Sequence, residues 1–226
     1  MIDLPDVTLV AIDGGPLADL VDLAVRDSFE HIRFGDFLLR EHLPSPIASV
    51  DDWNKAIWHT VPAMIETSHY LVIQWDSWVI NPAAWSDDFL GYDYIGAPWG
   101  WHRTGPNVGN GGFSLRSKRL GLYLRDHAEV FPVKFPEDDW LCRRYRPLLR
   151  GDLLFAPDDV AYRFSRERTG WELPNPSFGF HGLFNFPRVL TMPQLGERIA
   201  LFNDYATSRV EYPQMLQAMY ERRAAA

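Results

Sequence analysis

The sequence has one cysteine, Cys142, and no long apolar run. A single cysteine excludes an internal disulfide. No stretch reaches the roughly 20 apolar residues that a membrane-spanning helix needs, and the amino terminus shows no secretion signal pattern. We therefore expect a cytoplasmic protein without an integral membrane segment, either soluble or lying against the inner face of the membrane.

Basic runs are also scarce. They amount to Arg143-Arg144 and Arg222-Arg223, in a chain with a formal net charge of −8. This balance argues against a nucleic-acid partner, because such partners require a basic surface. The sequence further lacks a Walker lysine, a serine nucleophile elbow and any His-x-x-x-His spacing, which excludes the corresponding nucleotide, hydrolase and zinc sites.

Aromatic residues are abundant, with nine Trp, nine Tyr and fourteen Phe in 226 residues. Such rings fill a core, but they also stack on sugars and bases, so the count leaves a carbohydrate or nucleotide site open. The chain is long enough for one large domain, and no repeat or linker divides it. We expect a single domain over residues 1–226.

Strand and helix patterns alternate along the first third of the chain. Short apolar runs predict strands at residues 7–12, 31–39 and 70–74, and helical spacing predicts helices at 17–29 and 51–68. This order predicts an α/β fold with a mostly parallel sheet, whose ligands lie at the carboxyl ends of the strands. The later chain predicts a strand at 160–164 and helices at 115–127, 138–146, 196–207 and 213–223, so that the part from about 190 to 226 is helical.

A glycine-rich loop is the most informative segment. It lies within residues 92–118, where Gly109, Gly111 and Gly112 surround Asn110. Glycines allow positive φ values and let the backbone approach a ligand closely. Asn-Gly between apolar runs is equally the signal of a tight hairpin, so these residues predict either a ligand loop or a turn.

Three acidic positions follow predicted strands or open a helix. Asp13 ends the first strand and Asp76 follows the third, where each is also typical of a plain turn. Asp138 lies in a run of three acids at a predicted helix start, where acids also favour the helix dipole. The residues alone leave both interpretations open at all three positions.

Five strings together resemble a known family. They are QWDSW, YDYIGAPW, GNGGFSLRS, EDDWLCR and FGFHG. Their combination looks like the nucleotide-sugar glycosyltransferases of GT-A fold, and in particular like a bacterial and fungal family of that fold known mainly from sequence. The resemblance covers residues 7–186, and it implies a GT-A-like domain.

The resemblance implies a metal and a donor site. Gln74-Trp75-Asp76 takes the place of the Asp-x-Asp motif, so that Asp76 would bind Mn²⁺ or Mg²⁺ bridging the donor diphosphate, with His181 as a second ligand. Gln74 departs from the motif by removing one charge. Asp13 would hold the base or ribose of the nucleotide. Carboxylate, imidazole and phosphate ligands suit both metals.

The same resemblance implies a general base and a moving loop. Asp138, which follows Glu137, matches the base that takes the acceptor proton in inverting enzymes. The donor pocket would then include Gly109, Asn110, Gly111 and Gly112. The acceptor side would be closed by a flap consisting of Trp99, Trp101 and His102, with Glu137 beside it.

We therefore expect a glycosyltransferase that moves a hexose-type sugar from a UDP- or GDP-linked donor to a hydroxyl of a glycan or lipid-linked acceptor, as in polysaccharide biosynthesis. Inversion is expected, and retention stays open. One rival is a sugar-nucleotide nucleotidyltransferase, although Asp13-Gly14-Gly15-Pro16 lacks the basic residues typical of its first loop. Another rival is a non-catalytic nucleotide- or glycan-binding protein, which Gln74 favours.

Overall fold

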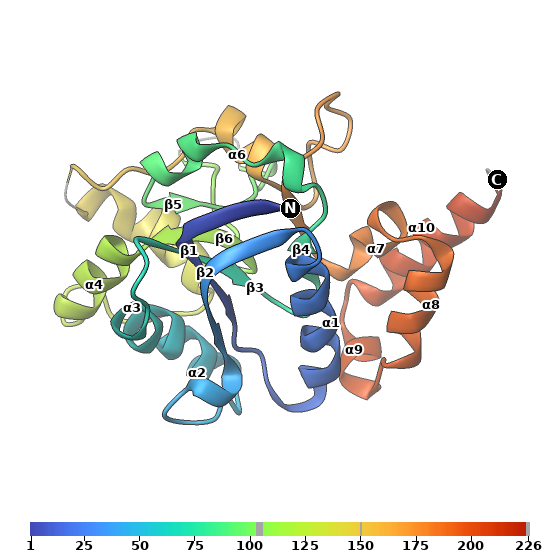
Figure 1. Ribbon diagram of the computed structural model, residues 1–226, viewed down its shortest axis with the longest axis horizontal. Helices are drawn as coiled ribbons and strands as arrows, with labels where there is room; N and C mark the ends of the chain where they lie inside the picture. The colour runs from blue at the N-terminus through green and yellow to red at the C-terminus, as the bar shows by residue number, and fades with distance from the viewer. Residues whose placement is uncertain (103–105, 150, 225–226) are drawn as a thin grey trace.

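A five-stranded sheet in the order β2-β1-β3-β6-β5 runs through the computed structural model, which describes residues 1–102, 106–149 and 151–224 (Figure 1). β1 (Ile2–Ala11), β2 (Ile32–Leu39) and β3 (His69–Ile73) are parallel, β6 (Phe113–Ser117) is antiparallel to β3, and β5 (Tyr94–Ile95) is antiparallel to β6. The predicted α/β sheet is therefore mixed, with β6 running against the other four strands. Parallel neighbours need a crossover helix, and the chain between β3 and β6 forms only short strands and turns.

A second, smaller sheet lies beside the first. β8 (Gly179–His181) is its central strand, with β4 (Ser77–Val79) antiparallel on one side and β7 (Ser165–Arg166) parallel on the other. β4 follows β3 after only three residues, so the second sheet begins where the main sheet ends. This short connection brings the two sheets together at the carboxyl edge of β3.

Both faces of the main sheet are covered, as the alternation of apolar side chains along its strands requires. Leu9 and Leu71 belong to a core beneath α1 (Ala18–Phe29) and the second sheet, whereas Val10 and Val72 face a second core. The helices of that second core are α2 (Val50–Lys55), α3 (Val61–Met64) and α4 (Lys118–Asp126), together with a wide helical turn at Trp140–Tyr145 that continues α5 (Glu137–Asp139). No helix among the described residues is long and apolar enough to cross a membrane.

Two predicted elements in the middle of the chain differ from the structure. The strand predicted at residues 160–164 is wrong, because this segment is the helix α6 (Asp158–Phe164), with Asp158 and Asp159 in its first turn. A short apolar run does not separate a strand from a buried helix. The helix predicted from residue 115 begins only at Lys118, since Ser117 caps it by accepting a hydrogen bond from Leu120 N, and the residues before it pair in β6.

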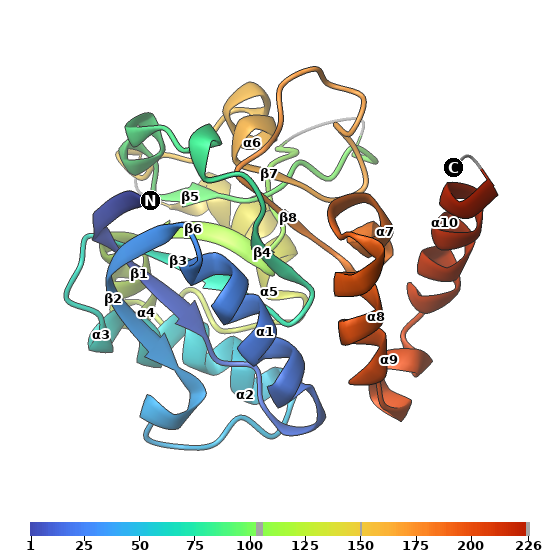
Figure 2. The same cartoon turned by 45° about the vertical axis from the view of Figure 1, so that its right-hand side comes forward.

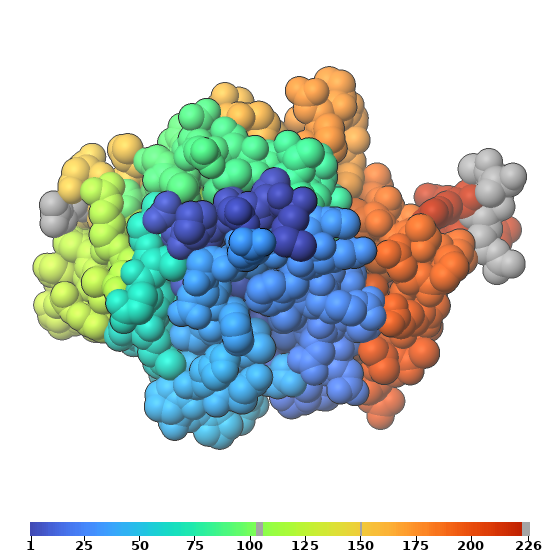
Figure 3. All heavy atoms as spheres, viewed as in Figure 1, coloured from blue at the N-terminus to red at the C-terminus, as the bar shows by residue number. Residues whose placement is uncertain are grey.

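The chain ends in four helices that form an arm beside α1 (Figure 2). They are α7 (Phe186–Val189), α8 (Met192–Ala200), α9 (Asp204–Ser208) and α10 (Tyr212–Ala224). The helix predicted at 196–207 is broken between α8 and α9, where Asn203 caps α9. Leu195, Ala206 and Met215 are buried in the same core as α1, and the space-filling view shows the arm packed against the amino-terminal part (Figure 3). Residues 225–226 of the predicted helical part lie outside the described residues.

Candidate active site

A cleft of about 520 Å³ lies at the carboxyl edge of β1 and β3. This is where an α/β sheet is expected to hold its ligand. Its walls come from the turns that follow β1 and β3, the start of α2, the end of the glycine loop, α5, the end of β8 and the α9 region. Gly109 and Asn110, predicted for the donor pocket, are not among its lining residues. The predicted site residues on these walls are Asp13, Gln74, Asp76, Gly111, Gly112, Glu137, Asp138 and His181.

Strand register brings Asp76 and His181 together. Ser77 pairs with His181 across β4 and β8, so the residue before Ser77 lies beside the histidine. Gly182 N donates to the Asp76 backbone oxygen at 3.0 Å, and the Asp76 Oδ1 to His181 Nε2 distance is 3.5 Å. Residues about 100 positions apart in sequence therefore form one acid–imidazole pair.

The Asp76–His181 pair is buried among further polar groups. His181 Nδ1 lies 2.9 Å from Asn110 Nδ2 and 3.3 Å from Glu167 Oε1. Burial alone would lower the pKa of His181, but the carboxylates of Asp76 and Glu167 raise it to about 10. For Asp76 burial acts in the other direction and tends to raise the pKa, but the charge of His181, and to a smaller extent that of Arg209, lowers it. Without a ligand, the two neighbouring carboxylates therefore favour the charged form of the His181 imidazole.

Two atoms of this cluster are suited to hold a cation. Asp76 Oδ1 is buried and has no hydrogen-bond partner among the described residues, and it faces His181 Nε2. No group of three or more His, Cys, Asp or Glu side chains in the described part of the chain is arranged to hold a metal ion. The protein thus offers two ligands of the right chemistry, and a ligand in the cleft would have to complete the shell.

Asp13 stabilises the turn that contains Asp76. Its Oδ2 accepts a hydrogen bond from Trp75 N at 3.0 Å, and Gln74 Nε2 lies 3.5 Å from its Oδ1. Burial, with a contribution from the charge of Asp76, raises the pKa of Asp13 to about 6. Gln74 is therefore an uncharged neighbour of Asp13. An acid at position 74 would instead place a second negative charge beside the Asp13 carboxylate.

The glycine loop is a close-packed wall, not a tight hairpin. The hairpin alternative at Asn110-Gly111 is wrong, since Val108 bridges Pro98 while Phe113 pairs with Ile73. Asn110 has a φ of 64°, a left-handed value that asparagine tolerates. Its side chain accepts from Phe113 N and contacts His181, so it links the loop to the acid–imidazole pair.

Gly112 is required by close approach. A Cβ atom there would lie 2.2 Å from His181 Nε2 and 2.5 Å from Gln74 Oε1. We expect Gly112→Ala to lower the free energy of unfolding by about 1 to 3 kcal/mol, because His181 is held on its other side and cannot move freely. Urea unfolding measures this change. Gly91→Ala is the matched control, since a Cβ at Gly91 meets nothing within 4 Å. Equal unfolding midpoints for the two variants would contradict this packing.

Asp138 faces the same cleft from the start of α5. Its Oδ2 accepts a hydrogen bond from Gly111 N at 3.0 Å, and its Oδ1 accepts one from Asp139 N at 2.9 Å. Burial raises the pKa of Asp138 to about 6, and the neighbouring charge of Glu137 adds to the effect. A carboxylate with a raised pKa in a cleft is suited to accept a proton near neutral pH.

Glu137 lines the cleft and is also the partner of a buried arginine, and its predicted place on the acceptor side stays a prediction. Its Oε1 accepts a hydrogen bond from Arg116 Nη2 at 2.6 Å, and its Oε2 accepts one from Trp58 Nε1 at 2.9 Å. Arg116 and Glu137 are 2% and 4% exposed, so both charges of the pair are buried. The carboxylate is fully engaged, and it fixes α5, and hence Asp138, against α2–α3 and β6.

The predicted flap residues do not line the cleft. Trp99 is buried in the second core and lies against Gly109, where a Cβ would approach its ring within 2.1 Å. Trp101 is 52% exposed, and its ring lies 5.8 Å from that of His102. Residues 103–105 of this loop lie outside the described residues. The predicted closure of the loop over the cleft stays a prediction.

No sequence pattern predicted three residues in or behind the cleft wall, Glu167, Tyr205 and Arg209. Glu167 reaches His181 because β7 and β8 pair in parallel, with Arg166 opposite Phe180. Tyr205 and Arg209 line the cleft from α9 and the residue that follows it. No local pattern marks these positions, since each depends on a long-range packing contact.

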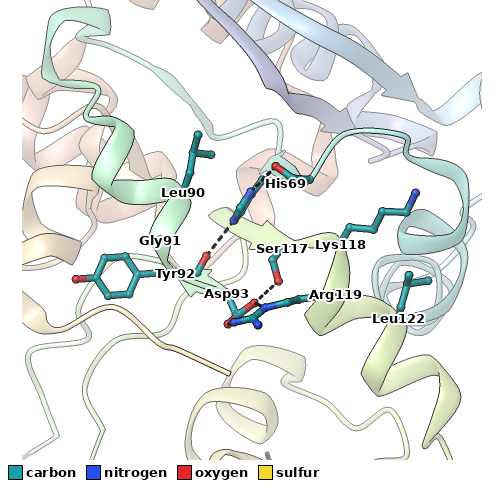
Figure 4. Close-up of a pocket in the computed structure, with 10 residues that line it drawn as sticks. His69, Leu90, Gly91, Tyr92, Asp93, Ser117, Lys118, Arg119 and Leu122 are labelled. Carbon is teal, nitrogen blue, oxygen red and sulfur yellow. Dashed lines mark hydrogen bonds and ion pairs between the residues drawn. The ribbon is translucent and has the colours of Figure 1, made fainter. Parts of the chain in front are cut away.

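A second hollow, of about 380 Å³, lies at the opposite edge of the main sheet (Figure 4). His69 there is held between Ser68 Oγ at 2.9 Å and the Tyr92 carbonyl at 3.1 Å. Asp93 accepts hydrogen bonds from Ser117 Oγ, Arg119 and Leu154 N. The polar groups of this hollow form hydrogen bonds to one another and so connect neighbouring elements of the fold. The hollow is therefore not the candidate site.

Several solved structures resemble this fold. A glycosyltransferase involved in glycosylation of the major capsid of PBCV-1 matches with a TM-score of 0.53 and 12% identity, over 87% of this chain and 99% of that chain. The glycosyltransferase GlyE of Streptococcus pneumoniae gives a TM-score of 0.45 and 11% identity over 98% of this chain and 64% of that one. The galactosyltransferase LgtC, in complex with donor and acceptor sugar analogues, gives 0.43 and 12% over 100% of both. The first likeness shows that the chain has the fold of GT-A glycosyltransferases.

A family model described as "Protein of unknown function (DUF5672)" matches residues 49–181. The match covers more than half of the chain, and the chain belongs to this family. No curated protein matches the sequence. Asp76, Asp138 and His181 lie within the matched residues, whereas Asp13 and Arg209 lie outside them.

Proposed function

We propose that this member of the DUF5672 family is an inverting glycosyltransferase that transfers a sugar from a nucleoside-diphosphate donor to a hydroxyl of a glycan or lipid-linked acceptor. The observation that carries the proposal is the convergence of the Asp76–His181 pair and Asp138 on one cleft, at the carboxyl edge of the parallel strands. A cleft of about 520 Å³ is within the usual range for small-molecule sites. The GT-A fold supports the same interpretation by analogy.

Asp76 and His181 would hold Mn²⁺ or Mg²⁺ together with the donor diphosphate. Asp76 Oδ1 is a buried acceptor without a hydrogen-bond partner among the described residues, and His181 Nε2 faces it, so both atoms fit this use. Glu167 would accept a hydrogen bond from His181 Nδ1 and so turn Nε2 toward the cleft, as carboxylates commonly do behind a ligating histidine. When bound, the metal supplies Lewis-acid stabilisation of the negative charge on the leaving diphosphate.

Asp138 is the proposed general base. It would take the proton of the acceptor hydroxyl as that oxygen forms a bond to the anomeric carbon of the donor sugar. The bond from the anomeric carbon to the diphosphate oxygen breaks at the same time, and the nucleoside diphosphate leaves with the electron pair. Gly111 N, which donates to Asp138 Oδ2, holds the carboxylate in place.

The donor would lie between the β1 turn and the glycine loop. Asp13 and Gln74 line this part of the cleft, where they are placed to meet the base or ribose. Gly111 and Gly112 line the same cleft, and their lack of side chains lets the loop backbone pack closely against Glu137 and His181.

Calorimetry with UDP and with GDP tests the proposal. We expect one of the two to bind, and to bind more tightly with Mn²⁺ present than with EDTA. His181→Ala is expected to weaken the Mn²⁺-dependent binding by about 10-fold or more, because one of the two protein ligands is lost. His31→Ala is the control, since His31 is 61% exposed and lies outside the cleft.

The outcomes separate the alternatives. Failure of both nucleotides to bind would refute the transferase proposal. Binding that is equal with Mn²⁺ and with EDTA would refute the metal site and leave the donor site standing. Binding without turnover of any UDP- or GDP-sugar would favour the non-catalytic binding protein.

A further inference from the structure

The C-terminal arm forms part of the cleft wall. Tyr205 lies in α9 and Arg209 follows that helix, and both side chains line the cleft. Asn203, which caps α9, also donates from Nδ2 to the Pro16 carbonyl in the turn after β1. Ala206 is fully buried in the main core. The arm is thus attached to the cleft at a turn that itself lines it, and α9 lies beside the start of α1 (Figures 1 and 2).

Carboxyl groups outnumber cationic groups on the cleft walls. The lining includes the four carboxyl groups of Asp13, Asp76, Glu137 and Asp138. Arg116 neutralises Glu137 but is itself buried behind it. Among the described lining residues, those that can carry a positive charge are His181, which lies between two carboxylates, and Arg209. An anionic ligand entering this cleft therefore meets Arg209 as the more available of the two cations.

Arg209 is held loosely enough to bind a ligand. Its side chain is 41% exposed, and its ion pair with Glu211 has an Nε to Oε2 distance of 3.5 Å. That contact engages Nε and is longer than a good charged hydrogen bond. Its positive charge also acts on Asp76, on the same wall. A planar guanidinium in this position can donate two parallel hydrogen bonds to phosphate oxygens.

We propose that Arg209 binds the diphosphate of the nucleotide donor, so that the C-terminal arm completes the donor site. This inference rests on the proposed function. When the bond between the sugar and the diphosphate breaks, negative charge grows on the leaving group, and the guanidinium stabilises it in addition to the Asp76–His181 side of the cleft. Arg209 lies outside residues 49–181, so a chain truncated after His181 would lose this contact.

The test compares diphosphate and nucleoside binding. Ligand-detected NMR titrations with UDP, GDP, uridine and guanosine are made on the full chain and on Arg209→Ala, Arg209→Lys and Arg33→Ala. Arg209→Ala is expected to weaken binding of the diphosphate about tenfold and to leave the nucleoside unchanged, because only the phosphate contact is lost. Arg209→Lys should bind the diphosphate with an affinity between that of the unaltered chain and that of Arg209→Ala, since lysine keeps the charge without the planar guanidinium.

Arg33→Ala controls for net charge. Arg33 is in β2, 72% exposed, and its ion pair with Asp3 also measures 3.5 Å, but it lies outside the cleft. This variant should bind every ligand like the unaltered chain. Urea unfolding of all variants shows whether the fold is retained.

Each other outcome is decisive. If the unaltered chain binds UDP or GDP and Arg209→Ala binds it equally well, the inference is overturned while the proposed function stands. If Arg209→Ala weakens the diphosphate and the nucleoside alike, the arginine acts on the shape of the cleft and not on phosphate, which also overturns it. If the unaltered chain binds neither nucleotide, the proposed function fails first.

Discussion

Replacing Asp138 by asparagine is expected to lower the rate of donor turnover by about 10²- to 10⁴-fold, because a general base contributes about that much. The measurement is release of nucleoside diphosphate from a panel of UDP- and GDP-sugars, with water or an added hydroxyl compound as the acceptor. Affinity for the nucleoside diphosphate should change little, since Asp138 accepts hydrogen bonds from Gly111 and Asp139 and is not placed at the Asp76–His181 pair.

The pH profile gives a second measure of the same residue. The pKa of Asp138 is raised to about 6, first by burial and then by Glu137. A base must be unprotonated to act, so kcat/KM of the unaltered enzyme should rise with pH and level off above about 6. The linked effect on stability has the opposite sign. Between the unfolded pKa of 3.8 and about 6 the folded state holds the extra proton, so this group makes the protein less stable as pH rises through that window.

Asp139→Asn is the matched control for Asp138→Asn. Asp139 is adjacent in α5 and 30% exposed, and it pairs with Arg143 and Arg144 at the surface at 3.7 and 3.5 Å. Its replacement removes the same charge and should leave donor turnover within about twofold, because surface pairs contribute little. If the two variants turn over the donor at the same rate, Asp138 is not the base.

Glu137→Gln is expected to lower the free energy of unfolding by about 3 to 5 kcal/mol, which is the usual cost of breaking a buried ion pair from one side. The change leaves the Arg116 guanidinium charged in a place where it is 2% exposed. Arg116 Nη1 and Nη2 both donate to Glu137, which is therefore the carboxylate that satisfies them. Urea unfolding monitored by tryptophan fluorescence measures the loss, and Asp139→Asn again provides the control, with a change of about 1 kcal/mol or less.

A double replacement separates buried charge from lost packing. Arg116→Met combined with Glu137→Gln removes the buried positive charge that Glu137→Gln alone leaves unpaired. The carbonyl oxygen of the introduced side-chain amide can still accept a hydrogen bond from Trp58 Nε1. Replacing both partners of a buried pair is often close to neutral, so the double variant should recover much of the stability that Glu137→Gln loses. If Glu137→Gln alone is as stable as the unaltered chain, the buried pair does not anchor α5.

The alternation of strand-like and helix-like apolar patterns predicted much of the fold. The parallel strands β1, β2 and β3 and the helix α1 overlap the elements that the local patterns predict, although β1 begins at Ile2 and not at the predicted residue 7. α6 did not follow its pattern, since a short, mostly apolar segment fits a strand and a buried helix equally well. The direction of β6 was also hidden, because it depends on how the chain crosses the sheet and not on its own residues.

The sequence by itself determined the kind of fold and the chemical groups of the site. Strand-end acids, a glycine-rich loop and an acidic helix start are local features, and together with the family resemblance they pointed to Asp13, Asp76, Asp138, Gly111 and Gly112, which line the cleft. Only the tertiary structure decided which of these groups meet and which are already engaged. Register between β4 and β8 joins Asp76 to His181, and the buried ion pair with Arg116 holds the Glu137 carboxylate. The contributions of Glu167 and Arg209 arise from pairing and packing between distant segments, which no local pattern encodes.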